Sequence, residues 1–235
     1  MLELNKVLLA VPTKGLIDSN TVTRLQAIRD ASPTLPPIQY VASKLSISDV
    51  RNAIVRTFLE HPAKYDYLIL IDEEVVPHKN LLNILNHNEP IVGAPYFISR
   101  PEINLPFPGI FTFEKERKVY IPFEKPFEYY GNPALVVCDA VATGCIAIQR
   151  TVLEHPDMKA PFNVTYNAWG CQVMSDDVAF CSRAQKAGFD IYCDFGIPAD
   201  HMIQGISMNM LHSQYARAYN MIKKAEEDKS RIIIP

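Results

Sequence analysis

Apolar runs of strand length alternate with segments of helical period over the first 75 residues of the chain. The runs KVLLAVPT, IQYVAS and YDYLILI are short and continuous, which is typical of strands buried on both faces of a parallel sheet. Between them, residues 19–31 and the segment SISDVRNAIVRTFLEHP have the pattern of helices. The order strand, helix, strand, helix, strand predicts an α/β fold with a mostly parallel central sheet flanked by helices.

The second of these helices is expected to begin at Ser48, whose side chain can cap it, and to end before Pro62. Arg51 then falls in the first turn, where the helix dipole disfavours a cation. Two explanations are open. Arg51 and the helix N-terminus bind an anion such as a phosphate together, or Arg51 is an exposed side chain paired with Asp49. The apolar stripe of this helix consists of Val50, Ile54, Val55, Phe58 and Leu59.

The rest of the chain differs in composition and in hydrophobic pattern. Residues 95–133 are rich in proline and aromatic residues without a helical period, which indicates loops and a small excursion of short antiparallel strands. Two short strands are expected around Thr143 and Gly144, and the segment SDDVAFCSRAQKAG is expected to be a helix capped by Ser175. Apolar residues recur at helical spacing from Met208 onward. We therefore expect one domain over residues 1–205 and an amphipathic helix with a tail over 206–235.

The composition is that of a globular protein, with 48% hydrophobic and 21% charged residues. The net charge of −3 provides no strong basic field, so non-specific binding to nucleic acid is not expected. The five cysteines include no C-x-x-C pair, and an odd count of scattered thiols fits a reducing compartment better than a disulfide framework. The N-terminal apolar run of about six residues is too short for a signal peptide or a membrane span. We expect a cytoplasmic location.

In the stretch YDYLILIDEEVVP, an apolar strand is followed directly by three acids, Asp72, Glu73 and Glu74. In an extended chain Asp72 and Glu74 point to one side, and Glu73 points to the other as a bystander. Ligands bind at the carboxyl ends of parallel strands, and two carboxylates that face one spot repel each other unless a cation lies between them. Oxygen ligands suit Mg²⁺ or Mn²⁺. The alternative is an acidic turn whose side chains face water.

Three further residues are candidates for chemistry nearer the C-terminus. Asp176 and Asp177 lie in the first turn of a capped helix, which stabilises carboxylates by itself, yet one of the two could face a cleft as a general base. His201, expected on a loop after a strand, is either a metal ligand or a packing residue.

The order of these motifs, more than any one of them, is informative. AVPT ends a strand, Arg51-Asn52 lies on a helix, IDEEVVP follows a strand, and VATGCIAIQR, SDDVAFCSRAQKAGFDIYCDF and a lone histidine come after them. This order resembles the nucleotide-sugar-dependent glycosyltransferases of the GT-A fold, and among them the family-2-like enzymes. The resemblance covers about Lys6 to Met202, and it is most specific in DDVAFCSRAQKAGFDIYCD.

The resemblance implies a role for each matching position. Asp72 and Glu74 match the two acids of a D-x-D motif, which with His201 would hold Mn²⁺ or Mg²⁺ against the diphosphate of a nucleoside-diphosphate sugar. Asp177 matches the general base that activates an acceptor hydroxyl, and Asp176 matches the acid before it. The positions matched to the donor site are Pro12 and Thr13 beside the nucleotide base, Arg51 near the nucleotide, and Thr143 and Gly144 in the sugar pocket. The implied reaction is transfer of the sugar, with inversion, to a carbohydrate or other hydroxyl acceptor. Trp169, the only tryptophan, would then either stack on the acceptor sugar or anchor the core.

Two departures and two alternatives accompany the resemblance. Glu74 stands where the second aspartate is usual, and Asp176 stands where a glutamate is usual, so Asp176 and Asp177 could exchange roles. A sugar nucleotidyltransferase shares the architecture, but it normally has a glycine-rich loop where this chain reads VPTKGLIDSN. A non-catalytic nucleotide- or carbohydrate-binding domain is the other alternative. A nucleic-acid acceptor is not favoured, because the net charge shows no sign of a basic groove.

Overall fold

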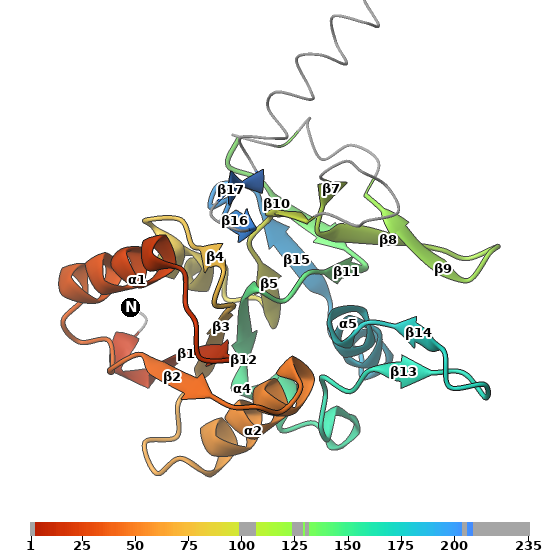
Figure 1. Ribbon diagram of the computed structural model, residues 1–235, viewed down its shortest axis with the longest axis horizontal. Helices are drawn as coiled ribbons and strands as arrows, with labels where there is room; N and C mark the ends of the chain where they lie inside the picture. The colour runs from red at the N-terminus through yellow and green to blue at the C-terminus, as the bar shows by residue number, and fades with distance from the viewer. Residues whose placement is uncertain (1–2, 99–106, 124–128, 130–131, 204–205, 209–235) are drawn as a thin grey trace, which may run out of the picture.

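A computed structural model of the chain describes residues 3–98, 107–123, 129, 132–203 and 206–208 (Figure 1). Its centre is a seven-stranded sheet. Across the sheet the strands are β10 (Leu135–Cys138), β15 (Ile191–Asp194), β5 (Ile91–Gly93), β12 (Cys145–Gln149), β3 (Tyr67–Ile71), β1 (Val7–Thr13) and β2 (Gln39–Ala42). Strand β1 runs parallel to β2 and β3, and β15 runs parallel to β5. Strand β12 is antiparallel to both of its neighbours, and β10 is antiparallel to β15. The predicted α/β class is confirmed, with a sheet that is mixed around a parallel core.

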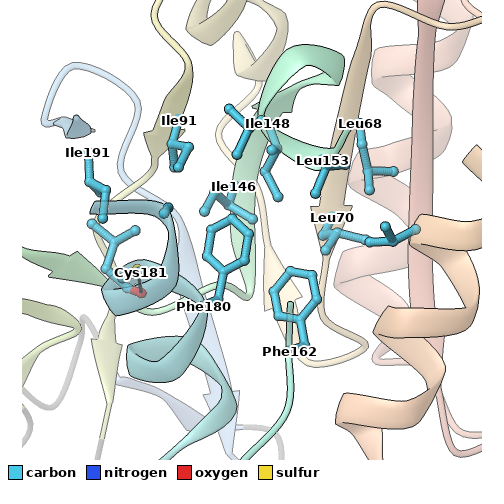
Figure 2. Packing of buried hydrophobic residues seen from close by; sticks show 14 of the residues in the cluster. Leu68, Leu70, Ile91, Ile146, Ile148, Leu153, Phe162, Phe180, Cys181 and Ile191 are labelled. Carbon is cyan, nitrogen blue, oxygen red and sulfur yellow. Dashed lines mark hydrogen bonds between the residues drawn. The ribbon is translucent and has the colours of Figure 1, made fainter. Parts of the chain in front are cut away.

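Both faces of the sheet are covered, and the alternation of side chains along β1 shows how. Leu8 and Ala10 join a core cluster that includes apolar residues of α2 (Ile47–Glu60) and α5 (Asp176–Lys186). Leu9 and Val11 join a second cluster with α1 (Ser19–Ala31) and the 3-10 helix η2 (Leu81–His87). Figure 2 shows the first cluster, in which the ring of Phe180 of α5 points toward Ile146 of β12. Strands buried on both faces require continuous apolar runs, as the sequence has.

Helix α2 begins earlier than the sequence predicted. Its N-cap is Ser46, whose Oγ accepts a hydrogen bond from the backbone N–H of Asp49 at 3.2 Å, so the expected cap at Ser48 is wrong. The Ser46 hydroxyl also donates to the Asp49 carboxylate at 2.6 Å. The shift places Arg51 beyond the first turn and points Asp49 at the cap. Arg51 is buried, so the exposed pair with Asp49 is wrong. Because Arg51 is not in the first turn, the helix N-terminus no longer gives a reason for an anion at this residue.

The smaller elements lie at the edges of this core. The antiparallel excursion predicted for the middle of the chain is confirmed in its described part. Its strands are β6 (Phe97–Ile98), β7 (Phe107–Pro108), β8 (Ile110–Glu114), β9 (Val119–Pro122) and β11 (Ala140–Val141). A hairpin of β13 (Thr165–Tyr166) and β14 (Gln172–Met174) precedes α5. The short helices are η1 (Leu4–Lys6), α4 (Arg150–Leu153) and η3 (Pro156–Met158).

His201 lies on a short strand rather than on a loop. Strand β16 (Asp200–Ile203) pairs with β4 (Val75–Val76) and with β17 (Ile206–Ser207), and His201 is opposite Val75. This pairing brings the histidine beside the acids that follow β3. The amphipathic helix predicted from Met208 onward lies outside the described residues, apart from its first position. In the part of the chain that the structure describes, no helix combines the length and apolarity needed to cross a bilayer.

Candidate active site

Arg51 is the centre of a buried ionic cluster at the carboxyl end of β3. Its Nη2 lies 2.8 and 2.6 Å from the two carboxylate oxygens of Asp72. Its Nη1 lies 2.5 Å from Asp176 Oδ2 and 3.0 Å from Asp177 Oδ1. Arg51 is only 3% exposed, and its guanidinium lies over the ring of Phe162 at 5.8 Å. One guanidinium thus joins acids that are more than a hundred residues apart in the sequence.

The charges in this cluster depend on one another. Burial alone would lower the pKa of Arg51, but the carboxylates of Asp72, Asp177 and Asp176 raise it well above its ordinary value. The guanidinium is therefore a permanent cation. Burial raises the pKa of Asp72 and of Asp176, and the charge of Arg51 opposes both shifts. With three carboxylates around one guanidinium, the cluster favours an additional cation over an anion.

The predicted Ser175 cap places Asp176 and Asp177 at the start of α5. Ser175 caps the helix by accepting a hydrogen bond from the backbone N–H of Val178, so Asp176 and Asp177 occupy its first turn. They are not equivalent. The Asp176 side chain is 13% exposed, whereas that of Asp177 is 26% exposed. Asp177 Oδ1 accepts hydrogen bonds from Arg51 and from the Thr143 hydroxyl. Among the described residues no hydrogen bond from another residue reaches the second carboxylate oxygen of either acid, so the greater exposure of Asp177 makes it the better placed of the two to take a proton.

Gly144 packs so closely against the acids that no side chain fits there. Its carbonyl accepts a hydrogen bond from the backbone N–H of Asp72, and its own N–H donates to the hydroxyl of Tyr96, both at 2.9 Å. A Cβ at this position would lie 2.5 Å from the Tyr96 hydroxyl and 2.8 Å from Asp72 Oδ2. Burial raises the pKa of Tyr96 well above its usual value. Tyr96 is a site residue that the sequence did not reveal, because it lies in a segment without a readable pattern.

Glu73 has a structural role that the expectation of a bystander missed. Its Oε2 accepts hydrogen bonds from the Thr13 hydroxyl at 2.5 Å and from the Lys14 N–H at 2.9 Å. Its backbone carbonyl accepts from the Asp18 N–H at 2.9 Å. The Thr13 hydroxyl also accepts from the N–H of Gly15, whose φ of +111° is a glycine conformation. Glu73 therefore fixes the loop that joins β1 to α1.

Pro12 and Thr13 are the last two residues of β1. Pro12 lies opposite Val41 in the pairing with β2, and Thr13 is buried. Both are at the same strand ends as the acid cluster, because β1 and β3 are parallel neighbours. The positions matched to a nucleotide site are thus beside the positions matched to the chemistry, with Glu73 connecting the two.

The predicted metal ligands divide into a pair and a separate residue. Glu74 Oε1 and His201 Nε2 face each other at 3.5 Å, while His201 Nδ1 lies 3.2 Å from the carbonyl oxygen of Phe97. If Nδ1 donates to that carbonyl, Nε2 directs a lone pair at the Glu74 carboxylate, an arrangement that a shared cation would stabilise. Asp72 does not join them, because both of its oxygens bind Arg51. Among the described residues no three His, Cys, Asp or Glu side chains are arranged to hold a metal ion. Glu74 and His201 fit a cation; a ligand role for Asp72 stays a prediction.

Trp169 is the most exposed large apolar side chain of the described chain, at 90%. It lies in the turn between β13 and β14, so the alternative of a core anchor is wrong. Tyr166, the tyrosine of the same hairpin, is 57% exposed.

Comparison with known proteins supports the fold. No protein family and no curated protein matches the sequence. Among solved structures, the protein A197 from STIV is similar over 84% of this chain and 85% of its own, with a TM-score of 0.53 and 19% identity. At this identity the likeness concerns the fold alone. The α/β fold expected from the sequence, with a parallel core and flanking helices, is confirmed, and A197 is similar to it over most of both chains.

Two weaker similarities accompany it. GalNAc-T7, solved with UDP, GalNAc and Mn²⁺, is similar over 86% of this chain but 38% of its own, with a TM-score of 0.47 and 10% identity. A protein described as mannose-1-phosphate geranyltransferase from Thermus thermophilus is similar over 83% of this chain and 75% of its own, with a TM-score of 0.43 and 11% identity. Both TM-scores are below 0.5, so no conclusion about this chain rests on these two structures.

Proposed function

We propose that this protein is a nucleotide-sugar-dependent glycosyltransferase whose chemistry takes place at the Arg51 cluster. The observation that carries the proposal is the convergence of Asp72 and Asp177 on Arg51 at the strand ends, where α/β sheets bind their ligands. Three distant motifs of a glycosyltransferase-like sequence supply these residues. A buried group of acids at a ligand-binding edge is costly for the fold, which favours a catalytic explanation over a purely structural one.

The donor would bind across the ends of β1 and β3. The loop after β1, held by Glu73, borders the nucleotide, and the Thr143-Gly144 segment borders the sugar. Arg51 has a different role from the one the sequence suggested. Its Nη atoms are occupied by three carboxylates, so it serves to keep these acids ionised and oriented rather than to bind the diphosphate directly.

Glu74 and His201 would hold a divalent cation, Mn²⁺ or Mg²⁺. Such a cation supplies positive charge that stabilises a departing diphosphate. The net negative charge of the neighbouring acids and the facing of Glu74 and His201 both favour a cation at this edge.

Asp177 is the proposed general base. It would accept the proton of an acceptor hydroxyl as that oxygen bonds to the anomeric carbon, while the bond from that carbon to the diphosphate oxygen breaks. Thr143 and Arg51 fix one carboxylate oxygen of Asp177, which leaves the other to meet the acceptor. Attack opposite to the leaving group inverts the anomeric configuration.

The loop after β1 argues against the alternative of a sugar nucleotidyltransferase. Such an enzyme needs free backbone N–H groups there to cradle a triphosphate. Here the N–H groups of Lys14, Gly15 and Asp18 already donate to Glu73 or Thr13. The loop has one glycine among these positions, so its backbone cannot rearrange as a glycine-rich loop does.

A panel of nucleoside-diphosphate sugars tests the proposal. Thermal shift with UDP, GDP and dTDP, with and without Mn²⁺, should identify one nucleotide that stabilises the protein in a metal-dependent way. Release of the nucleoside diphosphate from the matching sugar donor should then be measurable. Glu74→Gln should weaken the metal dependence, whereas the exposed control Glu116→Gln should not. Absence of both stabilisation and release across the panel would rule out the transferase.

A further inference from the structure

The hairpin before α5 is unusual in its composition and in its exposure. Residues 161–174, here called the arm, contain no charged residue and no histidine, although 21% of the chain is charged. At its turn Trp169 is 90% exposed, and Tyr166 and Val173 are 57% and 54% exposed. In Figure 1 the arm extends outward beside α5, beyond the central sheet. An exposed group of large apolar side chains marks a binding surface more often than a random feature of the surface.

Both ends of the arm are fixed to the elements that carry the acid cluster. At its first end, Phe162 is fully buried, stacks on Phe180 of α5 with ring centroids 4.7 Å apart, and lies under the guanidinium of Arg51. Asn52 of α2 accepts a hydrogen bond from the Phe162 N–H at 3.0 Å and donates to the Asn163 side chain at 2.9 Å. At its second end, β14 leads through Ser175 directly into Asp176 and Asp177. Both ends of the arm are therefore next to residues of the candidate active site.

The tip of the arm is held rigidly. The side-chain oxygen of Asn167 accepts hydrogen bonds from the N–H groups of Trp169 and Cys171, both at 3.0 Å. Its backbone carbonyl accepts from Gly170, and its N–H donates to the Cys171 carbonyl. Gly170 has a φ of +75°, which closes the turn without steric cost. Because the backbone of the turn is fixed, binding through Trp169 restricts little more than the two χ angles of that side chain.

We propose that the arm binds the acceptor, and that the acceptor is an uncharged glycan chain of several sugar units; this inference rests on the transferase function proposed above. A ligand of this kind matches an uncharged surface with exposed aromatic rings, which can stack on the apolar face of a sugar while nearby amides meet its hydroxyls. Nucleic acid and anionic membranes are disfavoured, because both are recognised chiefly by Lys and Arg, which the arm lacks.

The length of the arm indicates the size of the acceptor. Strand β14 has three residues, which at about 3.3 Å per residue separate the turn from the start of α5 by about 10 Å. A ligand that contacts both Trp169 and Asp177 spans about this separation. One sugar ring is too short for that, so the acceptor extends over several units, with its reactive end at Asp177 and its remote units at the tip.

Trp169 is the only tryptophan of the chain, so its fluorescence reports on the tip without labelling. Neutral gluco-, manno- and galacto-oligosaccharides of one to six units are titrated into the full-length protein. At least one series should give a saturable blue shift that strengthens with chain length and is absent with the monosaccharide. No response to any series would overturn the inference.

Variants connect this binding to transfer. With the donor and acceptor identified, Trp169→Ala should raise the acceptor KM about tenfold, as loss of an aromatic anchor does, and leave kcat and nucleotide affinity unchanged. Val137→Ala, which changes an exposed apolar residue on β10, is the matched control and should leave all three unchanged. An unchanged acceptor KM in Trp169→Ala contradicts the proposal.

The outcomes separate this inference from the proposed function. Slow hydrolysis of the donor in the absence of acceptor tests the transferase alone. Glycan binding without donor turnover would reject the transferase and keep the glycan site. Donor turnover without a Trp169 response would keep the transferase and reject the glycan site. A blue shift produced by zwitterionic lipid vesicles, or by raising the protein concentration, would overturn the glycan site in favour of a membrane surface or a second copy of the chain.

Discussion

The Arg51 cluster and the arm are neighbours in space and opposites in chemistry. The cluster surrounds one buried guanidinium with three partly buried carboxylates, whereas the arm exposes aromatic side chains and has no charge. They meet at Phe162, which lies under Arg51 and begins the arm. Fixed charges in a buried place serve to stabilise charge during a reaction, and a rigid uncharged surface serves to hold a neutral partner. The difference predicts that substitutions in the cluster affect folding and rate, and substitutions in the arm affect partner affinity.

The largest effect is expected from Arg51→Met, which leaves buried carboxylates without their counter-ion. Removal of one partner from a buried ionic group costs about 3–5 kcal/mol. Urea denaturation should therefore show a marked loss in the free energy of unfolding. Arg56→Met changes an exposed arginine of the same helix and should stay within about 0.5 kcal/mol of the wild type. Equal stability of the two variants would show that the cluster does not form.

Asp177→Asn is expected to have the next largest effect, on turnover. Loss of a general base lowers kcat by about 10²- to 10⁴-fold, while the affinity for the nucleotide stays unchanged. Asp176→Asn should reduce kcat much less, because Asp176 is more deeply buried and is held by Arg51. Steady-state kinetics together with calorimetric titration of the nucleotide distinguish the two. A larger loss in Asp176→Asn would exchange their roles.

Glu73→Gln tests the connection between the acids and the nucleotide loop. The amide still accepts one hydrogen bond but loses the negative charge, and the difference between a charged and a neutral acceptor is about 1 kcal/mol. The Kd of the nucleotide should rise about fivefold, with kcat almost unchanged. An unaltered Kd would mean that the loop keeps its shape without this charge.

The smallest effect on folding is expected in the arm. Trp169→Ala removes a side chain that is 90% exposed, so the free energy of unfolding should change by less than about 0.5 kcal/mol. Phe162→Ala, at the buried base of the same arm, should cost about 3–5 kcal/mol. Comparison of the two by denaturation locates the boundary between the binding surface and the structural base. A large loss in Trp169→Ala would place the tryptophan in a packed contact.

The sequence predicts the features of this molecule that depend on local pattern. Strands β1 and β3, the Ser175 cap of α5 and the position of Asp72 at a strand end follow from apolar runs and cap residues. These features are read from neighbouring residues, whose spacing matches the periods of strand and helix.

The features that the sequence did not predict depend on contacts between distant segments. Arg51 carries no local sign that it meets Asp176, which is 125 positions away. Nothing near Glu73 in the sequence indicates its contact with the loop after β1, because that loop is about sixty positions away. The N-cap of α2 is Ser46 and not Ser48, and the two serines lie within three residues of each other, so the cap residue was ambiguous in the sequence. Trp169 could not be assigned to core or surface, since its hairpin has too few residues to show a period.

The most direct test of the central claim is the release of nucleoside diphosphate from the donor selected by the thermal-shift panel, measured side by side in the wild type and in Asp177→Asn. The proposed function predicts metal-dependent release by the wild type and a loss of at least about a hundredfold in the variant, with unchanged nucleotide affinity in both. Equal rates in the two proteins would contradict it, because sugar transfer would then not depend on the acid that the fold presents at the Arg51 cluster.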